Sequence, residues 1–257
     1  MNDWNPQSYG RFADVRLQPA LDLLGAVQGL PDGGVVDLGC GSGAVAPALR
    51  HRWPARPMVG VDDSAAMLAR AQAAGTYDRI EQADIAHWQA EVPPALIYSN
   101  AALQWVPEHL RLIPALVGQL APEGTLAVQM PMQHAAPSHL AWAEAERAVY
   151  GTARTQTALH VLLPEGYFDL LSPLGTLRLW QTEYLQHLPA ADGAHPVRLF
   201  TESTFGKPFL DAAKPDEKAQ LIAAYERAMA KAYPVRADGT VLFPFRRLFF
   251  TLRLDQG

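Results

Sequence analysis

Residues 35–43 read Val35-Val36-Asp37-Leu38-Gly39-Cys40-Gly41-Ser42-Gly43. An apolar run interrupted by one carboxylate leads into three glycines that alternate with small side chains. Glycines at this place let the chain turn tightly from a strand into a helix, and they let the backbone approach a ligand closely. We therefore expect a strand over residues 35–38, a ligand-binding turn over residues 39–43 and a helix over residues 44–51.

The same succession of strand and helix recurs up to about residue 130. We expect further strands over residues 57–61, 79–83, 95–99 and 125–130, and helices over residues 64–74 and 109–120. Ser64 is the expected N-cap of the first of these helices. Regular alternation of the two elements predicts a doubly wound α/β fold, in which helices cover both faces of a parallel sheet.

The pattern changes after residue 130. We expect helices over residues 138–150 and 164–171, with Ser138 as the N-cap of the first, and a long antiparallel strand pair over residues 176–187 and 239–254. The segment between these strands contains Pro and Gly breaks and a helix over residues 215–233. The chain is expected to form a single domain over residues 1–257, with a helical cap contributed by about 131–165 and 188–238. Such insertions on a rigid scaffold tend to carry specificity.

Composition and charge exclude several classes of protein. The chain is 49% apolar and 18% charged, which is typical of a globular protein. Its 21 Lys and Arg against 26 Asp and Glu give a net charge of −5, so no concentrated basic surface for nucleic acid is expected. Cys40 is the single cysteine, and we find neither a signal peptide nor an apolar run of roughly 20 residues that could span a membrane. We expect a cytoplasmic monomer without a metal site.

Four polar side chains stand at the ends of four successive predicted strands: Asp37, Asp62, Asp84 and Asn100. Ligands of open α/β sheets bind at that edge of the sheet. Asp37 would repel a pyrophosphate and attract an ammonium group. S-adenosylmethionine carries an amino group and a sulfonium and no phosphate, so it fits this pattern. Asp62 could accept hydrogen bonds from ribose hydroxyls, and Asp84 could accept one from the adenine amino group.

Two other readings of the turn stay open. Gly39, Gly41 and Ala44 also fit the G-x-G-x-x-[GA] fingerprint of dinucleotide-binding proteins, which leaves a nicotinamide-dependent oxidoreductase as an alternative. Binding of a nicotinamide dinucleotide, with none of S-adenosylhomocysteine, would favour that alternative. A regulatory subunit that binds a cofactor without turnover is a non-enzymatic reading, which turnover of any small carboxylate would exclude.

Further stretches along the whole chain carry a family resemblance. They are Asp3-Trp4-Asn5-Pro6 with Tyr9, Phe12, Arg16 and Pro19; Asp84-Ile85 with Trp88; Asn100-Ala101 with Leu103-Gln104-Trp105; Leu126 to Pro131; and Arg247-Leu248-Phe249. With these motifs the chain resembles the class I S-adenosylmethionine-dependent methyltransferases and, within that class, the trans-aconitate 2-methyltransferase family. The resemblance implies a Rossmann-like sheet of seven mostly parallel strands with an antiparallel last strand.

The resemblance also implies roles for individual residues. Cofactor binding is expected from Tyr9, Arg16, Asp37, Gly39, Gly41, Asp62, Asp63, Met67, Asp84, Ile85 and Asn100. Binding of the methyl acceptor is expected from Gln104, Trp105, His134, Lys207 and Arg247, and the candidates for positioning the reactants are Arg16, Arg247 and Tyr184. Further cations and donors that an anionic acceptor could use are Arg154, His160 and His187.

The acceptor implied is a carboxylate of trans-aconitate or a related polycarboxylate, which would become a methyl ester. A carboxylate is already ionised at pH 7 and the sulfonium leaves as a neutral thioether, so catalysis is mainly positioning and no catalytic dyad is expected.

The cap departs from the family, with Phe200 in place of a Trp and Lys207 in place of an Arg, and these two cations are not equivalent at a carboxylate. The alternative is an O- or N-methyltransferase of a more apolar molecule. In that reading Phe200, Phe205 and Phe209 line the pocket, and His134 or His187 acts as the base for a hydroxyl acceptor.

Overall fold

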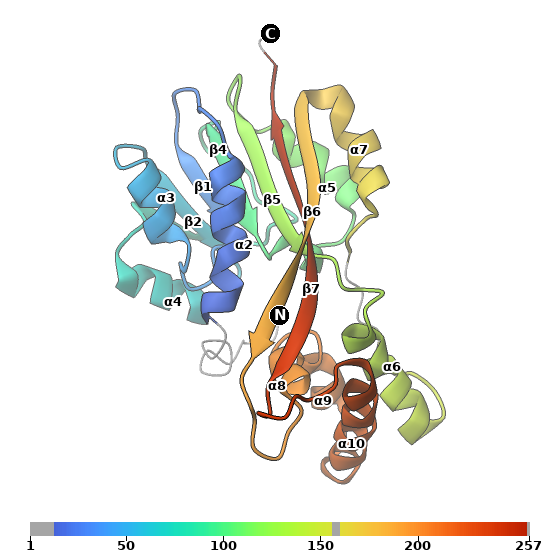
Figure 1. The fold of residues 1–257 in the computed structure, drawn as a ribbon. Helices are drawn as coiled ribbons and strands as arrows, with labels where there is room; N and C mark the ends of the chain where they lie inside the picture. The colour runs from blue at the N-terminus through green and yellow to red at the C-terminus, as the bar shows by residue number, and fades with distance from the viewer. Residues whose placement is uncertain (1–12, 156–159, 256–257) are drawn as a thin grey trace.

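A seven-stranded sheet forms the body of the protein in a computed structural model, which describes residues 13–155 and 160–255, with side chains from Leu17 onward (Figure 1). The strand order is β3-β2-β1-β4-β5-β7-β6. The strands are β1 (Val35–Leu38), β2 (Met58–Asp62), β3 (Arg79–Gln82), β4 (Leu96–Asn100), β5 (Thr125–Pro131), β6 (Thr176–Leu188) and β7 (Val241–Arg253). The pairings among β1 to β5 are parallel, whereas β7 runs antiparallel to both β5 and β6. The predicted fold class is therefore confirmed.

Helices cover both faces of this sheet, and this explains why the central strands are mostly apolar and buried on both sides. On one face α2 (Ala13–Ala26) and α3 (Ala46–Arg52) pack on residues such as Val35 and Leu96. On the other face α5 (His109–Val117) and α7 (Pro164–Leu171) pack on residues such as Val36 and Ile97. A strand that is buried on both faces has no solvent side on which polar residues could alternate.

Four further helices form a separate layer at the far end of the β6–β7 hairpin, which we call the cap (Figure 1). They are α6 (Pro137–Tyr150), α8 (Pro196–Glu202), α9 (Lys207–Ala212) and α10 (Pro215–Ala232). Trp142 is fully buried between them and stacks on Tyr225, with ring centroids 3.9 Å apart. The cap thus has an apolar core of its own, distinct from the two clusters on the sheet.

Local predictions differ from the structure in a few places. Ser64 is the N-cap of α4 (Ala65–Ala74), and its side chain accepts a hydrogen bond from the Met67 N–H at 3.4 Å. Ser138, by contrast, is not the N-cap of α6: that position is Ala136, because Pro137 already begins the helix. The helix predicted over residues 109–120 ends at Val117.

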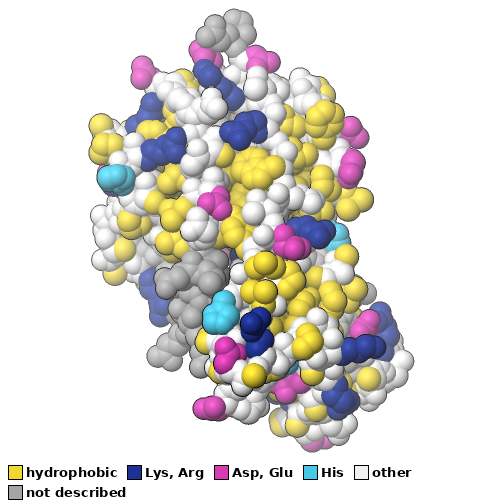
Figure 2. Space-filling view, in the orientation of Figure 1, with side chains coloured by type: hydrophobic (Ala, Val, Ile, Leu, Met, Phe, Trp, Pro, Cys, Tyr) yellow, Lys and Arg dark blue, Asp and Glu magenta, His cyan; other side chains and the backbone are white. Residues whose placement is uncertain are grey.

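The surface agrees with the mixed composition. Figure 2 shows Lys and Arg interspersed with Asp and Glu over both the sheet and the cap, so the described side chains of this face form no concentrated basic surface. Within residues 13–155 and 160–255, the structure contains no helix with the length and apolar character that crossing a membrane requires.

Candidate functional site

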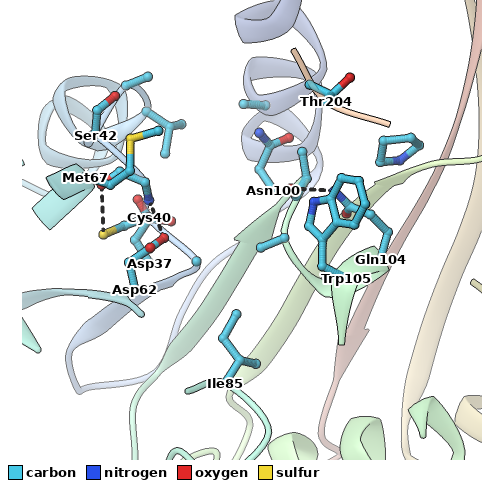
Figure 3. A pocket seen from close by; sticks show the side chains of 18 of the residues that line it. Asp37, Cys40, Ser42, Asp62, Met67, Ile85, Asn100, Gln104, Trp105 and Thr204 are labelled. Atoms are coloured by element: carbon cyan, nitrogen blue, oxygen red, sulfur yellow. Dashed lines mark hydrogen bonds between the residues drawn. The ribbon is translucent and has the colours of Figure 1, made fainter. Parts of the chain in front are cut away.

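A cavity of about 390 Å³ opens at the carboxyl ends of β1, β2 and β4 and reaches the cap. Figure 3 shows Asp37 and Asp62 together on one side of it and Asn100, Gln104 and Trp105 on the other. The sheet supplies the first side, and the second is completed by α8 and β7. Over the described ranges of the chain, no group of three or more His, Cys, Asp or Glu side chains could hold a metal ion.

The glycine turn is built for close approach. Gly39, Gly41 and Gly43 all have positive φ, at 79°, 53° and 81°, where a side chain is strained. A Cβ at Gly39 would lie 2.2 Å from the Cβ of Ala102, so no side chain fits there. A Cβ at Gly41 would meet nothing within 4 Å, because this glycine borders the open cavity. The turn therefore offers bare backbone to a ligand.

Asp62 holds this turn in place. Its Oδ2 accepts a hydrogen bond from the Gly41 N–H at 2.8 Å, and its Oδ1 accepts one from the Ser64 N–H at 3.0 Å. The side chain is half-buried and lines the cavity. A carboxylate has about four acceptor positions, so Asp62 retains capacity for ligand hydroxyl donors.

Asp37 is a buried carboxyl at the floor of the site. It is 1% exposed, and the Tyr77 hydroxyl donates a hydrogen bond to its Oδ2 at 2.5 Å. Burial raises the pKa of Asp37 to about 7; the Tyr77 hydrogen bond opposes this rise and the charge of Asp62 adds to it. A cationic ligand would favour the ionised form of this carboxyl.

Tyr77 was missed in the sequence, although one signal pointed to it. The residue lies between α4 and β3, and its ring reaches Asp37 across β2. A Cβ at Gly60 would lie 3.1 Å from this ring, so β2 needs a glycine at that position. A glycine inside a strand indicates the close approach of another group.

Arg247 occupies the opposite end of the cavity. It lies on β7, is 4% exposed and donates from Nη1 to Gln129 Oε1 at 3.2 Å. Its Cζ lies 4.8 Å from the centroid of the Phe245 ring. Four acidic side chains line the other end of the cavity, at the carboxyl ends of β1 and β2 and in the loop after β3. They are Asp37, Asp62, Asp63 and Asp84. The cavity thus fits a cationic group at one end and an anionic group at the other.

Buried polar atoms near the middle of the cavity lack partners within the described part of the chain. They are Oδ1 of Asn100, at the end of β4, and Oε1 of Gln104, whose Nε2 donates to the Ala101 carbonyl at 2.7 Å. Buried polar groups are nearly always hydrogen-bonded, so both oxygens indicate a place for ligand donors.

Most of the predicted site residues line this one cavity. They are Asp37, Gly39, Gly41, Asp62, Asp63, Met67, Asp84, Ile85, Asn100, Gln104, Trp105 and Arg247. Tyr9 and the side chain of Arg16 fall outside the described residues. Phe200 and Phe205, which the alternative reading used, also line the cavity, whereas Phe209 packs in the core of the cap.

Three predicted residues do not line the cavity. His134 lies in the connection between β5 and α6. Lys207 forms an ion pair with Asp211 on α9, and the Tyr184 hydroxyl donates to Asp22 Oδ2 at 2.5 Å.

The other candidate cations and donors also lie elsewhere. His187 is exposed on β6, Arg154 stacks over the Tyr150 ring, and His160 is absent from the lining. Conversely, His139, Thr201 and Thr204 line the cavity without any motif to mark them. They face it because of how α6 and α8 pack.

Comparison with known proteins identifies the family of the chain. A family model described as a methyltransferase domain matches residues 9–207. The trans-aconitate 2-methyltransferase of Variovorax paradoxus (strain S110) is 44% identical to this chain, and the alignment covers 97% of each. That of Paracidovorax citrulli (strain AAC00-1) is 43% identical, with 98% of this chain and 99% of the relative covered.

Solved structures share the fold. The YcgJ protein of Bacillus subtilis matches with a TM-score of 0.58 at 13% identity, covering 93% of this chain and 98% of that one. Phosphoethanolamine N-methyltransferase 2 of Haemonchus contortus, in complex with S-adenosylhomocysteine, matches with a TM-score of 0.55 at 14% identity, covering 96% and 58%. At these identities the likeness concerns the fold alone. On the family model and the full-length relatives, the chain belongs to the methyltransferase family and, within it, to the trans-aconitate 2-methyltransferases.

Proposed function

We propose that this protein transfers the methyl group of S-adenosylmethionine to a carboxylate of trans-aconitate or a closely related polycarboxylate. The products are a methyl ester and S-adenosylhomocysteine. The names of the full-length relatives support this acceptor. The observation that carries the proposal is the buried guanidinium of Arg247, placed at the end of the cavity opposite the acids.

The residues at the sheet end fit S-adenosylmethionine. Bare backbone at Gly41 allows close approach of the ligand. The carboxylates of Asp37 and Asp62, and Oδ1 of Asn100, which has no partner among the described residues, offer the acceptors that an amino group and a ribose require. Four carboxylates line the cavity there against one arginine, Arg70, so this end carries an excess of negative charge that disfavours a pyrophosphate. When bound, this cofactor supplies an electrophilic methyl group on a sulfonium.

The chain itself contributes mainly positioning. A guanidinium offers a planar pair of donors that match the two oxygens of a carboxylate. The rings of Phe200, Phe205 and Phe245 form apolar walls around Arg247, and low polarity strengthens its attraction for an anion. No general base is required, because the acceptor oxygen is already ionised.

A second candidate is an O- or N-methyltransferase of a more apolar molecule, and the three phenylalanine rings in the wall favour it. A screen with a labelled methyl donor over di- and tricarboxylates, hydroxyl acceptors and amines separates the two. Turnover confined to hydroxyl or amine acceptors would contradict the carboxylate proposal.

The direct test is the substitution Arg247→Ala, with Arg247→Lys beside it. We expect the KM for trans-aconitate to rise by about tenfold or more, since a hydrogen-bonded ion pair is lost, while the affinity for S-adenosylhomocysteine stays unchanged. The lysine variant should also have a raised KM, because an ammonium group lacks the planar pair of donors that a guanidinium offers. The matched control is Arg246→Ala: this neighbour is exposed and pairs with Glu183 at 3.4 Å. An unchanged KM in both Arg247 variants would remove Arg247 from the acceptor site.

We further propose that residues 1–257 act as one domain and as a monomer, with the cap segments 131–165 and 188–238 closing the acceptor side. Support comes from the single cavity that both layers line. Light scattering coupled to gel filtration tests the oligomeric state.

A further inference from the structure

His139 is a buried imidazole at the acceptor end of the cavity. It lies near the start of α6, is 6% exposed and lines the cavity together with Arg247 and Phe205. Its ring centroid is 4.3 Å from that of Phe205 and 6.4 Å from that of Phe245. The imidazole is therefore held between aromatic rings of the cap and of β7, and one of these rings, Phe245, also lies 4.8 Å from the Arg247 guanidinium.

The hydrogen bonding of Ser138 determines which nitrogen of this ring carries the proton. Ser138 is fully buried, and its Oγ lies 3.2 Å from His139 Nδ1. Within the described part of the chain this is the only partner of that hydroxyl. A buried donor left unsatisfied is costly, so the Ser138 hydroxyl donates to Nδ1. Nδ1 then accepts, and the proton resides on Nε2.

The ring is neutral near pH 7, because burial disfavours the charged imidazolium. Burial, together with the nearby His134, lowers the pKa of His139 to about 3. A neutral imidazole with its proton on Nε2 offers one N–H donor. Nδ1 is occupied by Ser138, and the ring lines the cavity, so Nε2 is the nitrogen available to a ligand. It can bind an anion without adding a second positive charge beside Arg247.

We propose that His139 is an acceptor-binding residue, whose Nε2–H donates a hydrogen bond to one carboxylate of the acceptor while Arg247 holds another. The proposal rests on the proposed function, since it presupposes an acceptor with at least two carboxylates. The acceptor end then has two hydrogen-bond donors of different kind, the charged guanidinium of Arg247 and the neutral Nε2–H of His139. An acceptor with two or more carboxylates could use both donors at once, whereas a monocarboxylate could use only one.

Three substitutions at this position test the assignment. His139→Phe keeps the packing against Phe205 and removes the donor. His139→Gln places an amide N–H near the position of Nε2, whereas His139→Asn reaches only to the position of Nδ1. The control is His195→Gln, because His195 is buried to a similar degree in the same cap, at 7% exposure, yet does not line the cavity.

The readouts are the KM and kcat for trans-aconitate, the affinity for S-adenosylhomocysteine by calorimetry, and the melting temperature. We expect the phenylalanine variant to raise KM about tenfold, which is the loss of one hydrogen bond to an ionised group, with the affinity for S-adenosylhomocysteine unchanged. The glutamine variant should have a KM close to that of the wild type, whereas the asparagine variant should have a KM close to that of the phenylalanine variant. His195→Gln should lower the melting temperature and leave KM as in the wild type.

Each contrary outcome has its own meaning. Turnover by the wild type with an unchanged KM in His139→Phe would overturn this assignment and leave the proposed function intact. An equal rise in KM for His195→Gln would show that cap stability, rather than the donor, sets KM, and it too would overturn the assignment. Equal KM values for the glutamine and asparagine variants would refute Nε2 as the donor. No turnover of trans-aconitate by the wild type would overturn both this inference and the proposed function.

Discussion

The substitution Tyr77→Phe probes how the buried carboxyl of Asp37 is kept ready for a cation. It removes one hydroxyl, which donates to Asp37 Oδ2 at 2.5 Å, and it keeps the ring that fills the space beside Gly43 and Gly60. That hydrogen bond lowers the pKa of Asp37, against the larger opposing effect of burial. Without it the carboxyl becomes harder to ionise, and a cofactor with an amino group loses its counter-charge.

The size of the effect follows from this one contact. A hydrogen bond to an ionised group contributes about 1.5 kcal/mol or more, roughly a tenfold change in the ionisation equilibrium. With its pKa at about 7, the wild-type carboxyl is half ionised at pH 7. A tenfold shift leaves about a tenth ionised, so the affinity should fall about fivefold at pH 7 and hardly at all at pH 9. In both proteins the affinity falls with falling pH, because the ionised form is the one that binds.

Calorimetric titration with S-adenosylhomocysteine between pH 6 and pH 9 measures this. The wild-type affinity should decline as the pH falls through about 7, and the Tyr77→Phe curve should be displaced to higher pH. Tyr167→Phe serves as the control, because its hydroxyl is also buried and bonded, to His109, but lies outside the cavity. An affinity for S-adenosylhomocysteine that falls equally at pH 7 and pH 9 would refute the reasoning, since it would point to a packing defect.

Three further outcomes are expected. Asp37→Asn should raise the free energy of unfolding of the cofactor-free protein at pH 8 by roughly 2–4 kcal/mol. The reason is that the pKa of Asp37 is raised in the folded state, so that the stability of the wild type declines as the pH rises from about 4 to about 7 and stays lowered above pH 7. Denaturation at pH 5 and pH 8 checks this, and an equal change in the free energy of unfolding at both pH values would contradict it. Gly39→Ala should abolish S-adenosylhomocysteine binding, because its Cβ would lie 2.2 Å from that of Ala102; retained affinity in calorimetry would show that the turn can move aside. Trp142→Ala should cost about 3–5 kcal/mol in urea denaturation, since this fully buried ring stacks on Tyr225, and a loss below about 1 kcal/mol would mean that the cap core relaxes into the space.

Much of the fold was predictable because its signals are local. The strand ahead of Gly39, the N-cap at Ser64 and the alternation of strands with helices each depend on a few neighbouring residues. The carboxyl ends of parallel strands meet at one edge of a sheet, so the sequence alone predicts that Asp37, Asp62 and Asn100 lie at the same site.

Some individual residues lie elsewhere than the sequence predicts. Ser138 is of a residue type that favours N-cap positions, yet Pro137 begins the helix and Ser138 lies buried in its first turn. Lys207 and Tyr184 were predicted near the acceptor, but neither lines the cavity. Lys207 pairs with Asp211 one turn along the same helix, which is a local contact, whereas Tyr184 donates to Asp22, which only the folded chain brings to it.

The sequence by itself determined the doubly wound fold, the glycine turn and the acidic side chains that surround the cofactor end. These features follow from hydrophobic periodicity and from the geometry of parallel strands, which hold for any chain with this pattern. Only the tertiary structure brought His139 and Arg247 to one cavity, because they come from segments more than a hundred residues apart and line it through the packing of the cap and β7. Side-chain packing of this kind depends on the shapes of all the residues involved, and no short motif encodes it.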